Sequence, residues 1–122
     1  MNCSIILAED EIEGKRWQKF LERGGHLVML YKNGTALCKD IYEGLKYDIA
    51  FVDLSLPEVD GDAIAQLSKQ LNPQVPVITM SGYGYAPKCS NMHLTKPITP
   101  EILERIVNEF QSSLSKERQK QP

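Results

Sequence analysis

Five polar side chains of this sequence have the types needed for chemistry on a phosphoryl group: Glu9, Asp10, Asp53, Ser81 and Lys96. Three carboxylates held close together repel one another at neutral pH, and a divalent cation would offset that repulsion. A small set of hard oxygen ligands that leaves room for water and a phosphate favours Mg²⁺ over Ca²⁺ or zinc. If these side chains converge, the sequence therefore predicts a magnesium site.

The remaining two members of the set indicate what such a site would do. The compact ammonium of Lys96 could hold one phosphoryl oxygen, and the Ser81 hydroxyl could donate a hydrogen bond to another. Aspartyl phosphate is a known product of nucleophilic attack by a carboxylate, so the set indicates phosphoryl transfer to one of its own acids. Taken singly, each residue also has an ordinary interpretation: Asp53 as a turn former, Asp10 as a helix cap, Ser81 as a polar turn residue and Lys96 as a surface lysine.

Short apolar runs and amphipathic segments alternate along the chain, and the candidate residues follow the apolar runs. Strands are expected at residues 5–8, 26–31, 48–54, 77–80 and 92–95. Helices are expected at residues 11–23, 35–43 and 61–71, and a last helix is expected to have Thr99 as its cap and Pro100 at its first position. This alternation is typical of a parallel α/β sheet, whose chemistry collects beyond the carboxyl ends of the strands.

The order of these features resembles the response regulator receiver family. The resemblance is carried by the acidic pair Glu9-Asp10, Asp53 within VDLSLPEVDG, Ser81 within VITMSG, Lys96-Pro97, and the Asn33-Gly34 start of the second helix. It covers roughly residues 4–110. It implies a flavodoxin-like, doubly wound sheet of five parallel strands in the order 2-1-3-4-5.

The resemblance also implies a role for each matching residue. Asp53 would be the phosphoacceptor, and Glu9, Asp10, Asp53 and the backbone carbonyl of Ser55 would hold Mg²⁺ directly or through water. Lys96 would pair with the phosphoryl group and Ser81 would move toward it, and Pro97 would follow a cis peptide bond. No other cofactor is implied.

Two features depart from the family pattern. His93 stands where the family usually has an aromatic residue that rotates when the Ser/Thr moves, so it is expected to act as a switch residue with altered coupling, with a surface histidine as the alternative. Only fourteen residues, 82–95, separate Ser81 from Lys96, and the segment GYGYAPKCSN has no apolar helical face. The usual fourth helix is therefore expected to be missing or much shortened.

Length and composition limit the remaining possibilities. A chain of 122 residues suits one domain, expected here at residues 1–111, with a polar tail or linker at 112–122 that frays and is too short for an output domain. A net charge of −2 gives no sign of direct nucleic-acid binding, and no apolar run approaches a membrane span. Three cysteines without metal-site spacing fit a cytoplasmic protein. Trp17 is expected in the core, and His26 at an edge or on the surface.

The sequence thus favours a phosphorelay signalling switch that is phosphorylated by a sensor histidine kinase or a phosphotransfer protein and acts on an unidentified downstream protein. It would catalyse only its own phosphorylation and dephosphorylation, and is not an enzyme acting on an external metabolite. The alternative is a docking module with a receiver fold that works without phosphorylation. A metal-dependent phosphohydrolase is a weaker interpretation, because Ser55 occupies the position where such an enzyme needs a second acid.

Overall fold

The computed structural model describes residues 2–120, with the backbone alone described for residues 113–120. A parallel sheet of five strands runs through the centre, in the order β2-β1-β3-β4-β5 that was predicted. The strands are β1 (Ser4–Ala8), β2 (Leu27–Tyr31), β3 (Ile49–Asp53), β4 (Val77–Ser81) and β5 (Met92–Thr95). Because β1, β3 and β4 are central, they are buried along almost their whole length, whereas β2 and β5 form the two edges.

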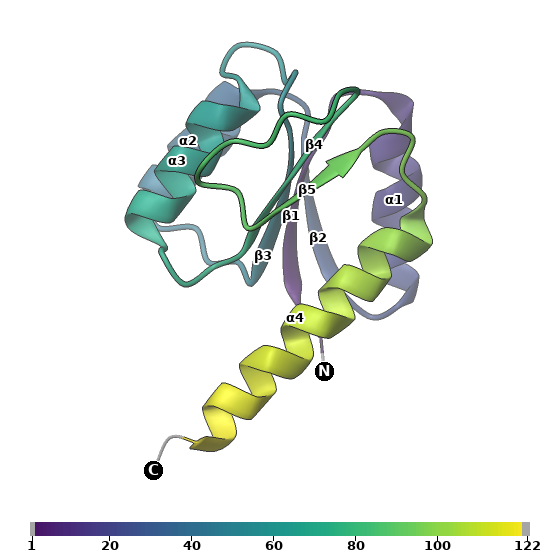
Figure 1. Cartoon of the computed structure of the whole chain (residues 1–122), viewed down its shortest axis with the longest axis vertical. Helices are drawn as coiled ribbons and strands as arrows, with labels where there is room; N and C mark the ends of the chain where they lie inside the picture. Colours follow the sequence, from purple (N-terminus) through teal and green to yellow (C-terminus); the bar gives the residue numbers. More distant parts are fainter. Residues whose placement is uncertain (1, 121–122) are drawn as a thin grey trace.

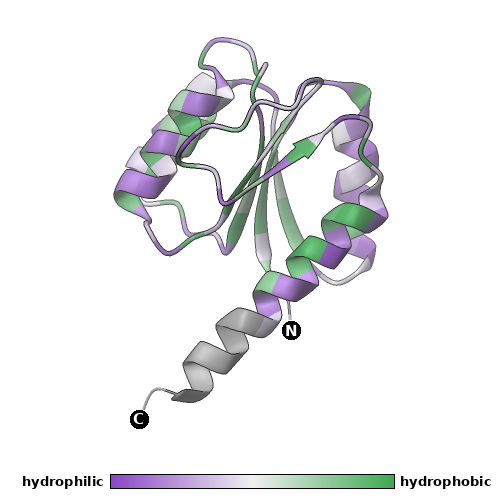
Figure 2. Ribbon diagram, viewed as in Figure 1, coloured by the Kyte–Doolittle hydropathy of each residue, from purple (hydrophilic) through white to green (hydrophobic). Residues whose placement is uncertain are grey.

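Helices cover both faces of the sheet (Figure 1). The helices are α1 (Ile12–Arg23), α2 (Gly34–Tyr42), α3 (Gly61–Leu71) and α4 (Pro100–Lys120). Helices α1 and α4 pack together over one face, and α2 and α3 pack together over the other. Successive strand residues point to opposite faces, so Ile5 and Leu7 enter the first core while Ile6 and Ala8 enter the second. Hydrophobic residues concentrate on the central strands and the helix faces toward them (Figure 2).

The helix starts follow local capping chemistry at two places. Asn33 accepts a hydrogen bond from the Ala36 amide at the start of α2, and Asp60 accepts one from the Ala63 amide at the start of α3. The predicted cap at Asp10 is wrong, because the N-cap residue of α1 is Glu11 and no side chain caps it. Asp10 lies one residue too early and remains with the acidic residues that follow β1.

The connection between β4 and β5 contains no helix, as predicted. Residues 82–91 form bends and turns, and residues 82–86 are all exposed. Pro87 is buried and Cys89 is partly buried against the core on the α3 side, so the second half of the segment is anchored. The helix after β5 is therefore the fourth in this chain.

Two expectations outside the site are corrected, the first of them only in part, because His26 does lie directly before the edge strand β2 but is not on the surface. His26 is buried with 7% of its surface exposed, and its Nδ1 accepts a hydrogen bond from the Cys3 amide at 3.1 Å, which satisfies the buried nitrogen. The helix α4 continues through Lys120 instead of fraying from Ser112. Lys, Glu, Arg and Gln favour helix, and a helix already begun adds residues more easily than it starts. Among residues 2–120, no helix combines the length and hydropathy needed to cross a membrane.

Candidate functional site

The three predicted acids meet at the carboxyl ends of two neighbouring strands. Glu9 and Asp10 directly follow β1, and Asp53 is the last residue of β3. Since β1 and β3 are hydrogen-bonded neighbours running in parallel, both ends lie at the same edge of the sheet. The carboxylates each offer an oxygen within 4.8 Å of the others. The convergence predicted from the sequence is confirmed.

Lys96 lies between the two buried acids. Its Nζ is 3.0 Å from Oε2 of Glu9 and 2.9 Å from Oδ2 of Asp53. The side chain of Glu9 is fully buried and that of Asp53 is 3% exposed, whereas 24% of the Lys96 side chain remains exposed. The peptide bond from Lys96 to Pro97 is cis, as predicted. One ammonium thus faces two carboxylates, which leaves the group with a net negative charge that Asp10 increases.

The proton affinities in the site follow from burial and from these pairs. Burial raises the pKa of Glu9 to about 7, since the neighbouring Lys96 lowers it less than burial and Asp53 together raise it. Burial works to lower the pKa of Lys96, but its hydrogen bond to Asp53 and its ion pair with Glu9 outweigh this, and the net pKa is raised. Lys96 therefore stays a cation while Glu9 is close to losing or gaining a proton.

The donor set fits a small hard cation. Oε2 of Glu9 is buried and, within the described part of the chain, receives no well-aligned hydrogen bond, although the Lys96 ammonium is near it. A buried carboxylate oxygen without such a partner is costly and is available as a ligand. Glu9, Asp10 and Asp53 could therefore hold a divalent cation of the Mg²⁺ type. The ligand role of the Ser55 carbonyl stays a prediction.

The backbone beyond β3 fixes the Asp53 carboxylate. The Ser55 amide donates to Oδ1 of Asp53 at 2.8 Å, so Oδ1 and Oδ2 have different partners. The chain then turns back, and Gly61 packs its Cα against the carbonyl of Asp53. A Cβ at Gly61 would lie 2.4 Å from that oxygen, so only glycine lets α3 start this close to the site. In the Asp60-Gly61 pair of the sequence motif, Asp60 thus caps α3 and Gly61 meets a steric requirement.

Ser81 ends β4 next to Asp53 and is hydrogen-bonded to His93. Oγ of Ser81 is 2.9 Å from Nε2 of His93, donates to the Tyr83 carbonyl, and accepts from the Tyr83 amide at 3.2 Å. Nδ1 of His93 is 2.8 Å from Oγ1 of Thr79, which in turn lies 2.8 Å from Oγ of Ser90. Ser81 and His93 were predicted from the sequence, whereas Thr79 and Ser90 were not. Their positions two residues before Ser81 and three before His93 were the available signal.

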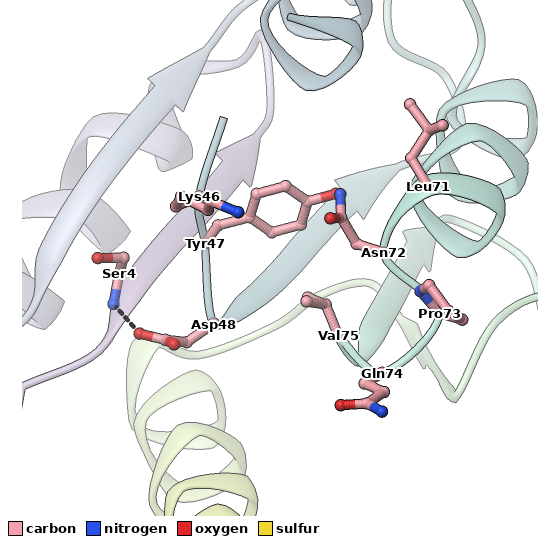
Figure 3. A pocket seen from close by; sticks show the side chains of 9 residues that line it. All are labelled: Ser4, Lys46, Tyr47, Asp48, Leu71, Asn72, Pro73, Gln74 and Val75. Atoms are coloured by element: carbon pink, nitrogen blue, oxygen red, sulfur yellow. Dashed lines mark hydrogen bonds between the residues drawn. The ribbon is translucent and has the colours of Figure 1, made fainter. Parts of the chain in front are cut away.

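The surface of the described residues has hollows near both ends of the strands. One, of about 340 Å³, is lined by Glu11, Glu13, Trp17, Lys96, Pro97 and Ile98, beside the acidic site. A larger one, of about 470 Å³, lies at the opposite end of the strands (Figure 3). There the carboxylate of Asp48 accepts from the Ser4 amide at 2.8 Å, and the Tyr47 hydroxyl bonds with Ser68 and Asn72. Because these polar groups already have partners, the larger hollow offers little chemistry.

Comparisons with known proteins agree on one family. A family model described as the response regulator receiver domain matches residues 5–108. The transcriptional regulatory protein ZraR of Escherichia coli (strain K12) is 31% identical over 83 residues, which cover 67% of this chain and 19% of that protein. The transcription factor SKN7 of Saccharomyces cerevisiae is 24% identical over 110 residues, which cover 84% of this chain and 18% of that protein. The chain thus spans about a fifth of the length of these relatives.

Solved structures agree on the fold. The receiver domain of the Francisella response regulator 1452 superposes with a TM-score of 0.82 at 21% identity, covering 93% of this chain and 99% of that one. The response regulator DrrB of Thermotoga maritima superposes with a TM-score of 0.80 at 21% identity, covering 93% of this chain and 54% of that one. The predicted flavodoxin-like architecture is therefore confirmed.

Proposed function

This chain belongs to the response regulator receiver domain family, and from that membership we propose that it is a phosphorelay switch whose Asp53 accepts a phosphoryl group with the help of Mg²⁺. The observation that carries the proposal is the pairing of one lysine with two buried acids at adjacent strand ends. An ordinary surface site would not bury two carboxylates around one cation, because desolvating charges is expensive. Such an energetically unfavourable arrangement is typical of a functional site at which charge changes during a reaction.

In the proposed reaction, a carboxylate oxygen of Asp53 forms a new bond to phosphorus while the N–P bond of a phosphohistidine breaks. The electron pair of that bond, and then a proton, go to the departing imidazole. Lys96 would hold a phosphoryl oxygen, and the Ser55 amide keeps the Asp53 carboxylate in one orientation. A Mg²⁺ held by Glu9, Asp10 and Asp53, with the Ser55 carbonyl as a further ligand, would offset the negative charge of the incoming group. Water attack on the acyl phosphate would later return Asp53 and inorganic phosphate.

The donor we propose is a sensor histidine kinase or a phosphotransfer protein, and the signal would pass to a downstream protein. The named relatives are transcriptional regulators of which this chain spans only a part, so the output remains unassigned. No external metabolite is turned over in this proposal, and the cytoplasmic location stays a prediction.

One observation favours the alternative of a docking module without phosphorylation. The connection between β4 and β5 lacks the helix that the family normally has there, so an output surface of the usual kind is not available. The intact acidic cluster and Lys96 argue against it, because a pure scaffold has no need for buried charges that repel one another. The same experiment separates the two.

The test is incubation with acetyl phosphate, with and without Mg²⁺, followed by mass measurement of the intact protein. We expect one phosphoryl group per chain that requires Mg²⁺ and is lost in Asp53→Asn. The matched control Asp62→Asn removes a carboxylate at the start of α3, outside the cluster, and should be phosphorylated like the wild type. Modification that persists in Asp53→Asn, or none in the wild type, would contradict the proposal and favour the docking module.

A further inference from the structure

A glycine, Gly14, lies on the face of α1 that is buried against the sheet. The buried residues of this helix are Gly14, Trp17 and Leu21, which are three and four positions apart and so share one face. Trp17 and Leu21 fill the first core, whereas Gly14 contributes no side chain to it. Apart from proline, glycine is the least favourable residue inside a helix. A glycine at this buried position therefore needs a reason in its surroundings.

The space that a side chain at position 14 would need is already occupied. A Cβ atom on Gly14 would lie 3.2 Å from Cγ of Glu9, 3.2 Å from the Glu9 carbonyl oxygen and 3.2 Å from Cδ1 of Leu30. Carbon atoms in favourable contact are about 3.5–4.0 Å apart, so these neighbours would have to move by a few tenths of an ångström. Two of the three crowded atoms belong to Glu9, one of the proposed metal ligands.

Glu9 has little freedom to move away, because it is held at both ends. Its amide donates to the Tyr31 carbonyl at 3.0 Å, which ties its backbone to the end of β2. At the other end, Oε1 accepts from the Glu11 amide at 3.3 Å, and Oε2 lies 3.0 Å from Nζ of Lys96. The side chain between these ends is fully buried. A displacement of Cγ would therefore be passed on to the carboxylate.

The position of Cγ determines where the Glu9 carboxylate lies. Glutamate carries its carboxylate on two methylene groups, and the second of them passes directly against Gly14. With Cγ in this place, the carboxylate reaches Lys96. It also offers an oxygen within 4.8 Å of those of Asp10 and Asp53. Crowding at Cγ would be relieved by rotation about the Cα–Cβ bond, and that rotation moves the carboxylate farther than Cγ itself.

We propose that Gly14 is a positioning residue for Glu9, because its lack of a side chain gives the buried glutamate the room to place its carboxylate beside Lys96 and the proposed cation. The proposal rests on the proposed Mg²⁺ site, where the position of that carboxylate matters for function. Gly14 lies outside the acidic cluster and contacts neither the cation nor the phosphoryl group. A substitution at position 14 therefore acts on the site through residue 9.

The first test is a double-mutant cycle in metal-free buffer, measured by urea unfolding. Alanine favours helix more than glycine does, so Gly14→Ala would raise the urea midpoint if the space around it were free. We expect it to lower the midpoint by about 0.5 M instead. In the Glu9→Ala background, which lacks Cγ, at least half of this loss should disappear, because the two sites interact directly. Equal losses in both backgrounds, or no loss in the wild-type background, overturn the proposal.

The second test measures Mg²⁺ affinity and asks whether Gly14 acts through the carboxylate. Gly14→Ala should bind Mg²⁺ about tenfold more weakly than the wild type, a loss typical of changing a residue that orients a metal ligand. In Glu9→Gln, which keeps Cγ but loses the charged ligand, Gly14→Ala should change the affinity by less than about twofold. The matched control Gly84→Ala, with open space around it, should bind like the wild type.

A general distortion of the site would weaken Mg²⁺ binding equally in the Glu9 and Glu9→Gln backgrounds, and that result overturns the proposal, as does an unchanged affinity in Gly14→Ala. If Gly14→Ala is too unstable to titrate, the double variant with Leu30→Val carries the same test, since it removes one close contact and keeps those with Glu9. A wild type that binds no Mg²⁺ would contradict the proposed function. The urea cycle would then decide by itself whether Gly14 makes room for Glu9.

Discussion

Replacing Lys96 with methionine should destabilise the metal-free protein through the two carboxylates that it pairs. Nζ of Lys96 lies 2.9 Å from Oδ2 of Asp53 and 3.0 Å from Oε2 of Glu9, and both acids are almost fully buried. Removing one partner of a buried ion pair costs about 3–5 kcal/mol. Since a quarter of the Lys96 side chain is exposed, we expect a loss of about 2.5 kcal/mol, which lowers the melting temperature by about 10 °C.

Saturating Mg²⁺ should remove most of this loss, because the cation then offsets the same acids. We expect the difference in unfolding free energy to fall below about 1 kcal/mol in Mg²⁺. By thermodynamic linkage, the roughly 1.5 kcal/mol of lost stability that Mg²⁺ restores must appear as a gain in Mg²⁺ affinity, so Lys96→Met should bind Mg²⁺ about tenfold more tightly than the wild type.

The measurement is urea unfolding with and without Mg²⁺, together with a Mg²⁺ titration. The single tryptophan, Trp17, lines the same hollow as Lys96 and can report both by fluorescence. The control is Lys15→Met, which removes an exposed lysine of α1 and should change stability by less than about 0.5 kcal/mol. An equal loss of stability with and without Mg²⁺, or a weaker Mg²⁺ affinity in Lys96→Met, would refute the reasoning that lysine and cation share these acids.

Three further outcomes follow from the site. In metal-free buffer, the pKa of Glu9 is about 7 in the folded state and 4.5 in the unfolded state, so protonated Glu9 stabilises the fold fully below pH 4.5 and this stabilisation is lost as the pH rises through 7. Unfolding curves should therefore show the free energy of unfolding fall by about 3 kcal/mol across this range. Glu9→Gln should not show this fall. Gly61→Ala should cost about 2 kcal/mol or more in urea unfolding, since its Cβ would meet the Asp53 carbonyl, whereas Gly84→Ala, with open space around it, should be close to neutral. Mg²⁺ at a hundred times its dissociation constant should raise the unfolding free energy by about 2.7 kcal/mol, and calorimetry should show this gain sharply reduced in Asp53→Asn.

The fold could be predicted because the hydrophobic pattern of each segment agreed with its place in a layered α/β sheet. Continuous apolar runs such as residues 49–52 are typical of strands buried on both faces, and parallel strands need crossover connections, usually helices, between them. The acids and Lys96 could be placed together once the strands were taken as parallel. The absence of a helix at residues 82–91 was predictable as well, since glycine and proline leave no apolar stripe there.

What the sequence did not reveal depends on contacts between residues that share no periodic pattern. The ring of His93 binds Thr79 and Ser81 because these three side chains lie on one sheet face, and neither spacing nor composition indicates which histidine nitrogen faces which hydroxyl. His26 is buried through a hydrogen bond to the backbone of Cys3, 23 residues earlier in the chain. A polar residue can be buried when it has a hydrogen-bond partner, and that partner can be identified only from the three-dimensional structure.

The exposure of residues 82–86 determines the thermodynamic character of any motion there. Tyr83 and Tyr85 already expose 55% and 60% of their surface, and it is polar atoms of Ser81 and His93 that hold the start of this segment. Opening it would uncover little hydrocarbon, so it should proceed with almost no change in heat capacity and with an enthalpy set by the broken hydrogen bonds. The logarithm of the opening equilibrium constant should therefore vary linearly with inverse temperature. The free energy of unfolding of the whole domain, by contrast, depends on temperature along a curve.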